Sequence, residues 1–217
     1  MHTKVTLPIQ GYQHESVPNT FYRQSETPRL AVLFPGYRYS CDMPVLYYPG
    51  QLMLSHGADV LQVDYFYDRP PDFAKRGDDE ALRRLYADAE AALEAGLRQR
   101  RYEQVIVIGK SLGTMAMAHL LTRHSTLPDS YWVWLTPALD PADVTRSLSV
   151  RPRSLFIVGT ADPLYDPNLI GELERAAGAR CVVIDNANHG LLIQGNIRLS
   201  IQALERVVDD MEEFLKL

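Results

Sequence analysis

The sequence has few cysteines, no long apolar run and no excess of positive charge, and each absence excludes a class of protein. Cys41 and Cys181 are the only cysteines among 217 residues, so the clustered Cys and His spacing of a structural zinc site is missing. No stretch approaches the ~20 apolar residues that cross a bilayer, and the first residues lack a signal-peptide core. The net charge of -5 provides no basic patch for nucleic acid. We therefore expect a cytoplasmic protein with free thiols and no metal, cofactor, membrane or nucleic-acid partner.

Internal repeats, low-complexity tracts and flexible linkers are also missing, which argues against a chain divided into separate units. Hydrophobic residues make up 46% of the sequence, which is enough to form a full core. The length fits one large domain more readily than two small ones. We expect a single domain over residues 1–217.

Short apolar runs that end in Gly, Pro or Asp predict the strands. Most are continuously apolar rather than alternating, which is typical of strands buried on both faces. The runs are Leu30–Gly36, Val60–Tyr67, Val105–Gly109, Tyr131–Pro137, Ser154–Asp162 and Cys181–Asn186. The segments Lys4–Gln10 and Ser16–Arg23 interrupt this pattern and predict an antiparallel hairpin at one edge of a sheet.

Helical spacing of apolar residues fills several intervals between these runs. It covers Asp78–Arg100, the residues after Ser111, Pro167–Gly178 and the last segment up to Leu215. The stretch from Cys41 to Gly57 is ambiguous because a proline and a glycine interrupt it. Alternation of strands and helices predicts an α/β fold, a doubly wound and mostly parallel sheet with helices on both faces.

Ser111 lies between two glycines where a predicted strand meets a predicted helix. The spacing Gly109-Lys110-Ser111-Leu112-Gly113 satisfies G-x-S-x-G, in which the serine occupies a strained turn and bulky flanking residues would collide with neighbouring elements. The helix N-terminus would also favour negative charge developing there. The alternative is a serine that only caps the helix. The position after a buried strand favours a nucleophile.

A catalytic serine needs a base and a carboxylate to orient that base. Of six histidines, His189 follows the strand Cys181–Asn186 and precedes a glycine that permits a tight loop. Asp162 directly follows another strand, in the same kind of position. Their alternatives are an ordinary loop histidine and a turn-forming aspartate. The order Ser111, Asp162, His189 is that of α/β-hydrolase triads.

Four segments in this order, "FPGYRYS", "GKSLGT", "GTADPLYD" and "NANHGL", make the chain resemble the α/β-hydrolase superfamily over nearly its whole length. The resemblance implies an oxyanion hole formed by the backbone N–H groups of Tyr37 and Leu112, although Pro35 replaces the family's usual histidine. The segment Thr136–Arg153 is too short for a cap domain. The chain is similar to small uncapped members, esterase-like or dienelactone-hydrolase-like, but has serine where dienelactone hydrolases use cysteine.

These residues predict a serine hydrolase, a carboxylesterase that acts on a small soluble acyl substrate as a monomer or homodimer. The alternatives are a non-catalytic binding or scaffold protein on the same fold, an acyltransferase or a peptidase. Four residues of the predicted site mouth, Arg38, Tyr39, Tyr65 and Tyr67, are candidates for substrate contact, although the tyrosines equally suit a role in covering the sheet end. The sequence assigns no role to Lys110.

Overall fold

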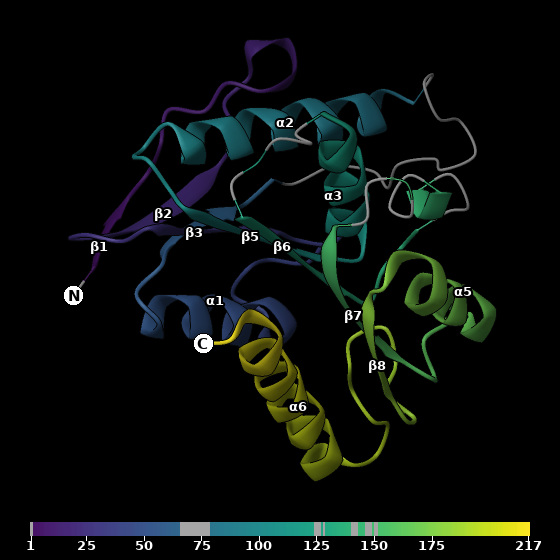
Figure 1. The fold of residues 1–217 in the computed structure, drawn as a ribbon. Coiled ribbons are helices and arrows are strands. Elements are labelled where there is room, and N and C mark those ends of the chain that lie inside the picture. Colours follow the sequence, from purple (N-terminus) through teal and green to yellow (C-terminus); the bar gives the residue numbers. More distant parts are fainter. Residues whose placement is uncertain are drawn as a thin grey trace.

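A computed structural model of the chain describes residues 2–65, 79–123, 127, 129–139, 143–145, 149 and 152–217. At its centre lies an eight-stranded sheet with the order β1-β2-β4-β3-β5-β6-β7-β8 (Figure 1). The strands are β1 (His2–Val5), β2 (Asn19–Gln24), β3 (Arg29–Phe34), β4 (Asp59–Val63), β5 (Gln104–Lys110), β6 (Asp129–Leu135), β7 (Arg153–Gly159) and β8 (Arg180–Ile184). Neighbouring strands from β4 to β8 in the sheet order pair in parallel.

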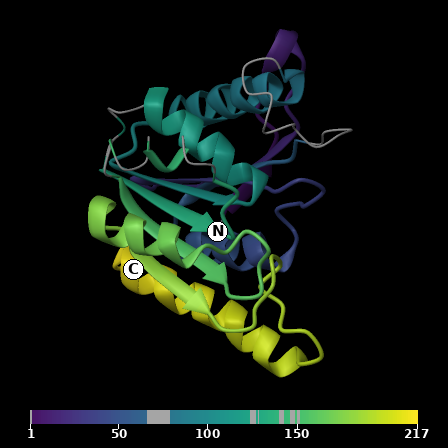
Figure 2. The same cartoon turned by 90° about the vertical axis from the view of Figure 1, so that its right-hand side faces the viewer.

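Helices cover both faces of this sheet. They are α1 (Pro44–Ser55), α2 (Glu80–Leu97), α3 (Leu112–Arg123), α5 (Pro167–Glu172) and α6 (Ile197–Leu215), with a 3-10 turn at Tyr12–His14 and a π-helical turn at Leu173–Ala177. Helices α2, α3 and α5 pack on one face, and α1 and α6 on the other. Figure 2 shows the twisted sheet edge-on between α2 and α3 on one side and α1 and α6 on the other. The predicted doubly wound α/β sheet is confirmed.

The N-terminal hairpin is confirmed as well. Strand β1 pairs antiparallel with β2, with His2 opposite Gln24, and β2 pairs antiparallel with β4. All four residues of β1 are exposed, so this strand forms a polar outer edge of the sheet. The hairpin therefore lies at one edge of the sheet, and the parallel strands that position the site follow it in the sheet order.

Side chains of β5 explain why the central strands are continuously apolar. Val105 and Val107 point to the face covered by α2 and α3, whereas Ile106 and Ile108 point to the face covered by α1 and α6. All four are completely buried. A strand between two helical layers needs apolar residues at successive positions, because neither face meets water.

A buried polar cluster closes the amino end of the parallel strands. Asp59, the first residue of β4, is fully buried and accepts hydrogen bonds from the Gln24 N–H at 2.7 Å and the Tyr102 hydroxyl at 2.7 Å. The Arg100 Nε lies 3.0 Å from the Asp59 Oδ2, the oxygen that also accepts from Tyr102. These contacts tie β2, β4 and the segment before β5 together, at the opposite end of the strands from Ser111.

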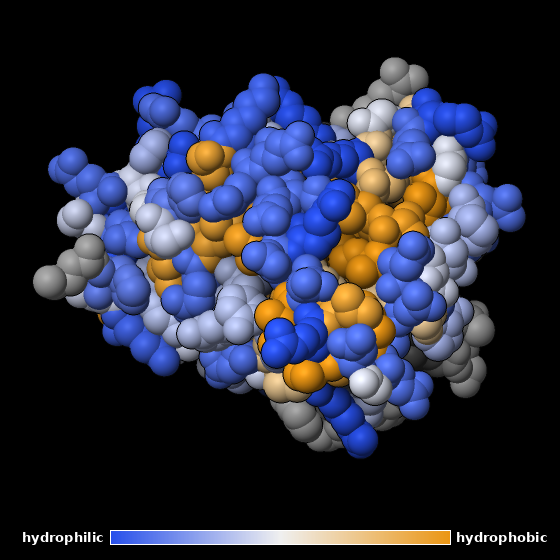
Figure 3. Space-filling model, turned by 90° about the horizontal axis from the view of Figure 1, so that it is seen from below, coloured by the Kyte–Doolittle hydropathy of each residue, from blue (hydrophilic) through white to orange (hydrophobic). Residues whose placement is uncertain are grey.

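The outer surface of α1 and α6 mixes apolar and polar side chains. Figure 3, seen from this side, shows hydrophobic side chains in separate patches among hydrophilic ones. The exposed large hydrophobic residues of these two helices are Tyr47, Tyr48, Ile197, Leu199 and Ile201. The choice between monomer and homodimer stays a prediction.

Two further properties bear on the expected class of protein. No helix within the described ranges combines the length and the apolar character needed to pass through a bilayer. Cys41 is buried and Cys181 is half-buried, and both are free thiols.

Candidate active site

The carboxyl ends of β5, β7 and β8 bring together the three residues that the sequence singles out. Ser111 directly follows β5, Asp162 follows β7 and His189 lies in the loop between β8 and α6. The three strands are parallel, so their carboxyl ends share one edge of the sheet. That edge is where open α/β sheets hold their ligands.

Ser111 occupies a left-handed turn with a φ of +52°. The turn is tight because a Cβ at Gly113 would lie 2.0 Å from the Phe34 carbonyl oxygen, and one at Gly109 would lie 2.3 Å from the Met117 Sδ. The Ser111 N–H donates to the Leu135 carbonyl oxygen of β6 at 3.0 Å. Strand, turn and helix therefore hold the serine in a conformation that few non-glycine residues adopt.

His189 connects the serine to the aspartate through hydrogen bonds of equal length. Its Nε2 lies 2.8 Å from the Ser111 Oγ, and its Nδ1 lies 2.8 Å from the Asp162 Oδ2. The imidazole is one-third exposed, whereas the Asp162 side chain is completely buried. The ring is thus open toward solvent on one side and fixed by a buried carboxylate on the other.

The buried carboxylate of Asp162 remains the charged form. Burial alone would raise the pKa of this carboxyl, but hydrogen bonds from His189 and from the Leu164 N–H lower it, as does the nearby positive charge of Lys110. The net effect is a lowered pKa. A negative charge at this point stabilises a positive charge on the imidazole.

The loops that carry Asp162 and His189 are joined to each other by contacts that sequence reasoning missed. A Cβ at Gly159 would lie 2.0 Å from the Ala187 carbonyl oxygen, so only glycine allows this approach. The side-chain oxygen of Asn188 accepts hydrogen bonds from the N–H groups of Gly190 at 2.8 Å and Leu192 at 3.1 Å. Asn188 therefore shapes the loop that carries His189. In the sequence, only its position next to His189 could have indicated this role.

The segment after β3 approaches the serine closely. A Cβ at Gly36 would lie 3.2 Å from the Ser111 Cβ. In the part of the chain that the structure describes, the backbone N–H groups of Tyr37 and Leu112 donate no hydrogen bond. Leu112 is the first residue of α3, whose N-terminal N–H groups have no partner within the helix. Both residues predicted as oxyanion donors therefore have an N–H available for a ligand.

The four residues predicted for substrate contact occupy different environments. Arg38 is exposed, with its guanidinium 5.3 Å from the ring centroid of Tyr37, and Tyr39 is half-buried. Tyr65 is only 6% exposed, and its hydroxyl donates to the Pro35 carbonyl oxygen at 3.0 Å. The Tyr65 hydroxyl therefore supports the loop from inside, and substrate contact by Tyr65 stays a prediction. Tyr67 lies outside the described residues.

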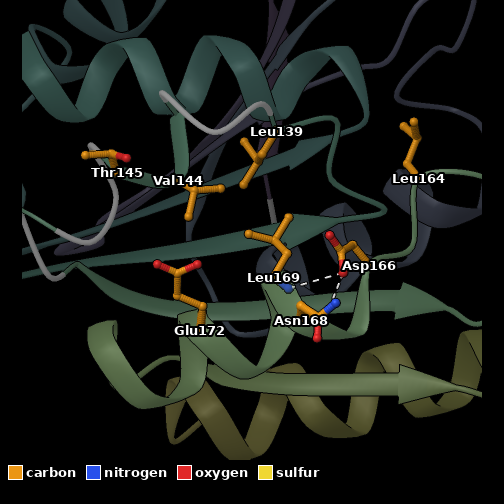
Figure 4. Close-up of a pocket in the computed structure, with 8 residues that line it drawn as sticks. All are labelled: Leu139, Val144, Thr145, Leu164, Asp166, Asn168, Leu169 and Glu172. Atoms are coloured by element: carbon orange, nitrogen blue, oxygen red, sulfur yellow. Dashed lines mark hydrogen bonds between the residues drawn. The ribbon is translucent and has the colours of Figure 1, made fainter.

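A cavity of about 460 Å³ lies between the segment after β6 and the start of α5. Figure 4 shows Leu139, Val144 and Leu169 converging on it from both sides, while Glu172 lies at one end. Leu164 lines the same cavity, and its N–H donates to the Asp162 Oδ1 at 2.9 Å. The cavity thus adjoins the loop of the buried aspartate and provides apolar surface beside the site.

The site has the components of nucleophilic chemistry. A hydroxyl, an imidazole and a carboxylate form one hydrogen-bonded chain, with free N–H groups beside the hydroxyl. Among the described residues, no group of three His, Cys, Asp or Glu side chains is arranged to hold a metal ion. Such a chain can transfer the proton of the hydroxyl to the imidazole.

Comparison with known proteins identifies the fold to which this site belongs. An esterase from Pyrococcus furiosus superposes with a TM-score of 0.71 at 15% identity, covering 100% of this chain and 90% of its own. A serine hydrolase without a lid from Xanthomonas campestris gives 0.66 at 18%, covering 97% and 94%. A protein of unknown function from Agrobacterium tumefaciens gives 0.73 at 15%, covering 100% and 97%.

No family model and no curated protein matches the sequence. The similarity of this chain to known proteins is therefore one of structure. The chain is an α/β protein with a serine, a histidine and an aspartate at the carboxyl edge of a parallel sheet. More particularly, it has the α/β-hydrolase fold.

Proposed function

We propose that the protein is a serine hydrolase that cleaves an ester bond of a small acyl substrate. The observation that carries the proposal is the hydrogen-bonded chain from Ser111 through His189 to the buried Asp162. The φ of +52° at Ser111 supports it, because strain of this kind persists at functional sites. Hydrolases among the structural neighbours support the reaction class.

In the first half of the reaction, the Ser111 Oγ attacks the ester carbonyl carbon while its proton passes to the His189 Nε2. Asp162 accepts the Nδ1 hydrogen bond and stabilises the imidazolium. The N–H groups of Tyr37 and Leu112 bind the oxyanion, and one such donor lowers the barrier by about 3 kcal/mol. The intermediate collapses, the C–O bond to the alcohol breaks, and the imidazolium returns the proton to the leaving alkoxide.

In the second half, water hydrolyses the acyl-serine. The His189 Nε2 takes a proton from water as its oxygen attacks the acyl carbon, and the same N–H groups bind the new oxyanion. The bond to the Ser111 Oγ then breaks, and the serine recovers its proton from the imidazolium. The products are an alcohol and a carboxylic acid, and the enzyme returns to its starting state.

Covalent labelling by a fluorophosphonate probe tests the proposal most directly. We expect the folded protein to be labelled at Ser111 and to hydrolyse 4-nitrophenyl butyrate. Ser111→Ala should remove labelling and lower kcat by 10⁴-fold or more, an order of magnitude set by triad knockouts in general. Mass spectrometry of the labelled peptide identifies the modified residue.

Ser40→Ala is the matched control, because Ser40 is an exposed serine in the segment that follows β3. This variant should keep both labelling and turnover. Folded protein that takes up no probe would contradict the proposal and favour the alternative of a non-catalytic binding protein. Labelling without ester turnover would instead direct the search to acyl transfer or peptide cleavage.

A further inference from the structure

Lys110, the last residue of β5, places an ammonium group within the buried part of the site. The residue is only 4% exposed. Its side chain passes under Gly36, where an added Cβ would lie 3.3 Å from the Lys110 Cδ. The Nζ lies 4.9 Å from the ring centroid of Tyr39. Lys110 therefore lies beside both the nucleophile and the segment that supplies the Tyr37 N–H.

This ammonium has no carboxylate partner in the described residues. Among the described residues it forms neither an ion pair nor a hydrogen bond, and its one cation–π contact there is with the Tyr39 ring. The nearest charge that acts on it is Asp162, whose two oxygens already accept from His189 and from the Leu164 N–H. The Lys110 Nζ is not among the described side-chain atoms that are both fully enclosed and without a hydrogen bond, so the ammonium still reaches solvent and is accessible to a ligand. Its partial desolvation without a counter-ion is costly.

Burial lowers the pKa of Lys110 to about 8, and the Asp162 carboxylate opposes this shift only in part. At neutral pH the amine still carries its charge. A negatively charged group brought beside it would supply the missing counter-ion. A carboxylate carries one negative charge, which balances the single positive charge of one ammonium.

We propose that Lys110 binds a carboxylate carried by the substrate, so that the enzyme prefers esters with a free carboxylate over neutral esters of similar size. This inference rests on the proposed function and narrows its substrate class. Arg38, exposed on the segment that follows β3 and next to Tyr37, adds a second positive charge to this segment. The opposing possibility is that Lys110 acts only through Asp162, as a positioning residue.

The experiment compares kcat/KM for three esters in the wild type and in Lys110→Met, which removes the charge and keeps an unbranched side chain that is one atom shorter. The neutral ester is 4-nitrophenyl butyrate. Mono-4-nitrophenyl adipate carries a carboxylate on the acyl side, and 4-butyryloxy-3-nitrobenzoate carries one on the alcohol side. The two anionic esters thereby also show which side of the ester faces Lys110.

We expect the wild type to prefer one anionic ester. Lys110→Met should lower kcat/KM for that ester about 10- to 100-fold more than it lowers kcat/KM for the neutral ester, the size of a hydrogen bond to a charged group. Lys110→Arg should retain part of the preference. Lys4→Met, at an exposed lysine on β1, is the matched control and should change none of the three rates.

Equal losses on neutral and anionic esters would overturn the inference and assign Lys110 a positioning role. Unchanged rates on all three esters in a folded Lys110→Met variant would overturn it as well. Failure of the proposed function is distinguishable, because the wild type would then turn over none of the esters and Ser111 would not react with the fluorophosphonate. Circular dichroism of each variant confirms that it is folded.

Discussion

Two neighbouring residues at the sheet edge are held in the left-handed backbone region. Ser111 has a φ of +52° and Thr136, at the end of β6, a φ of +43°. The β-branched side chain makes Thr136 an outlier, and its buried hydroxyl has no hydrogen-bond partner among the residues that the structure describes. Strain of this kind costs on the order of 1–3 kcal/mol per residue. The rest of the sheet must therefore stabilise the edge that holds the site.

Lys110 gives a prediction about stability at the same scale. Lys110→Met should raise the free energy of unfolding by about 1–3 kcal/mol at pH 7, because it removes an unpaired buried charge. The pKa of Lys110 falls from 10.5 to about 8 on folding. The charged form therefore destabilises the fold fully below pH 8, and this penalty disappears as the pH rises toward 10.5.

Urea denaturation of both proteins at pH 7 and at pH 10 measures this effect. The groups that act on Lys110 are the Tyr39 ring and the Asp162 carboxylate, and both are retained in the variant. The stability difference between the two proteins should shrink from pH 7 to pH 10. A difference that is the same at both pH values would mean that packing, rather than charge, separates the two proteins.

At the scale of single elements, Gly113 sets how closely α3 approaches β3, and Gly109 sets how closely α3 approaches β5. Gly113→Ala should destabilise the fold by about 1–3 kcal/mol or more, because the added methyl group would meet the Phe34 carbonyl group. Gly171→Ala, in α5, is the matched control because nothing lies within 4 Å of its added Cβ. That change should be neutral or stabilise by up to about 1 kcal/mol.

Thermal or urea unfolding of both variants provides the measurement. The two substitutions add the same methyl group to a helical glycine, so helix propensity favours both equally. Any difference between them reports the contact with β3. Equal stability of the two variants would mean that α3 can shift without cost.

Most elements could be predicted from the sequence because their signals are local. Continuous apolar runs indicated the buried strands, and Asp79 caps α2 by accepting from the Ala81 N–H. Helix α1 remained ambiguous because Pro49 lies within it. The contact that stabilises this helix cannot be inferred from the sequence. Because Gly50 has no side chain, the helix packs closely against Leu33 of β3.

The site was only partly predictable for a similar reason. Strand ends and spacing indicated Ser111, Asp162 and His189, and the structure brings them within hydrogen-bond distance. The direction of a side chain depends on contacts between distant parts of the chain. The burial of Lys110 and the inward orientation of Tyr65 therefore could not be inferred from the sequence. Catalysis by these residues stays a prediction until labelling tests it.

At the scale of the whole molecule, the site depends on contacts between distant parts of the chain. Ser111 and His189 are 78 residues apart in sequence, and Asp162 and His189 are 27 apart. Three loops after three different strands must therefore meet before the hydrogen-bonded chain exists. Pairings of this kind form slowly, because the chain must close long loops first.

Refolding from denaturant should consequently show a delay between structure and reactivity. Helices form from local contacts, so far-ultraviolet circular dichroism should recover before the serine becomes reactive. Stopped-flow dichroism and quenched fluorophosphonate labelling at matched times would measure both. Simultaneous recovery would mean that the sheet forms in one cooperative step. Under the proposed function, the reactivity of Ser111 would report on completion of the whole sheet. A probe for that reactivity would then also serve as a probe for the native state in a mixture of partly folded chains.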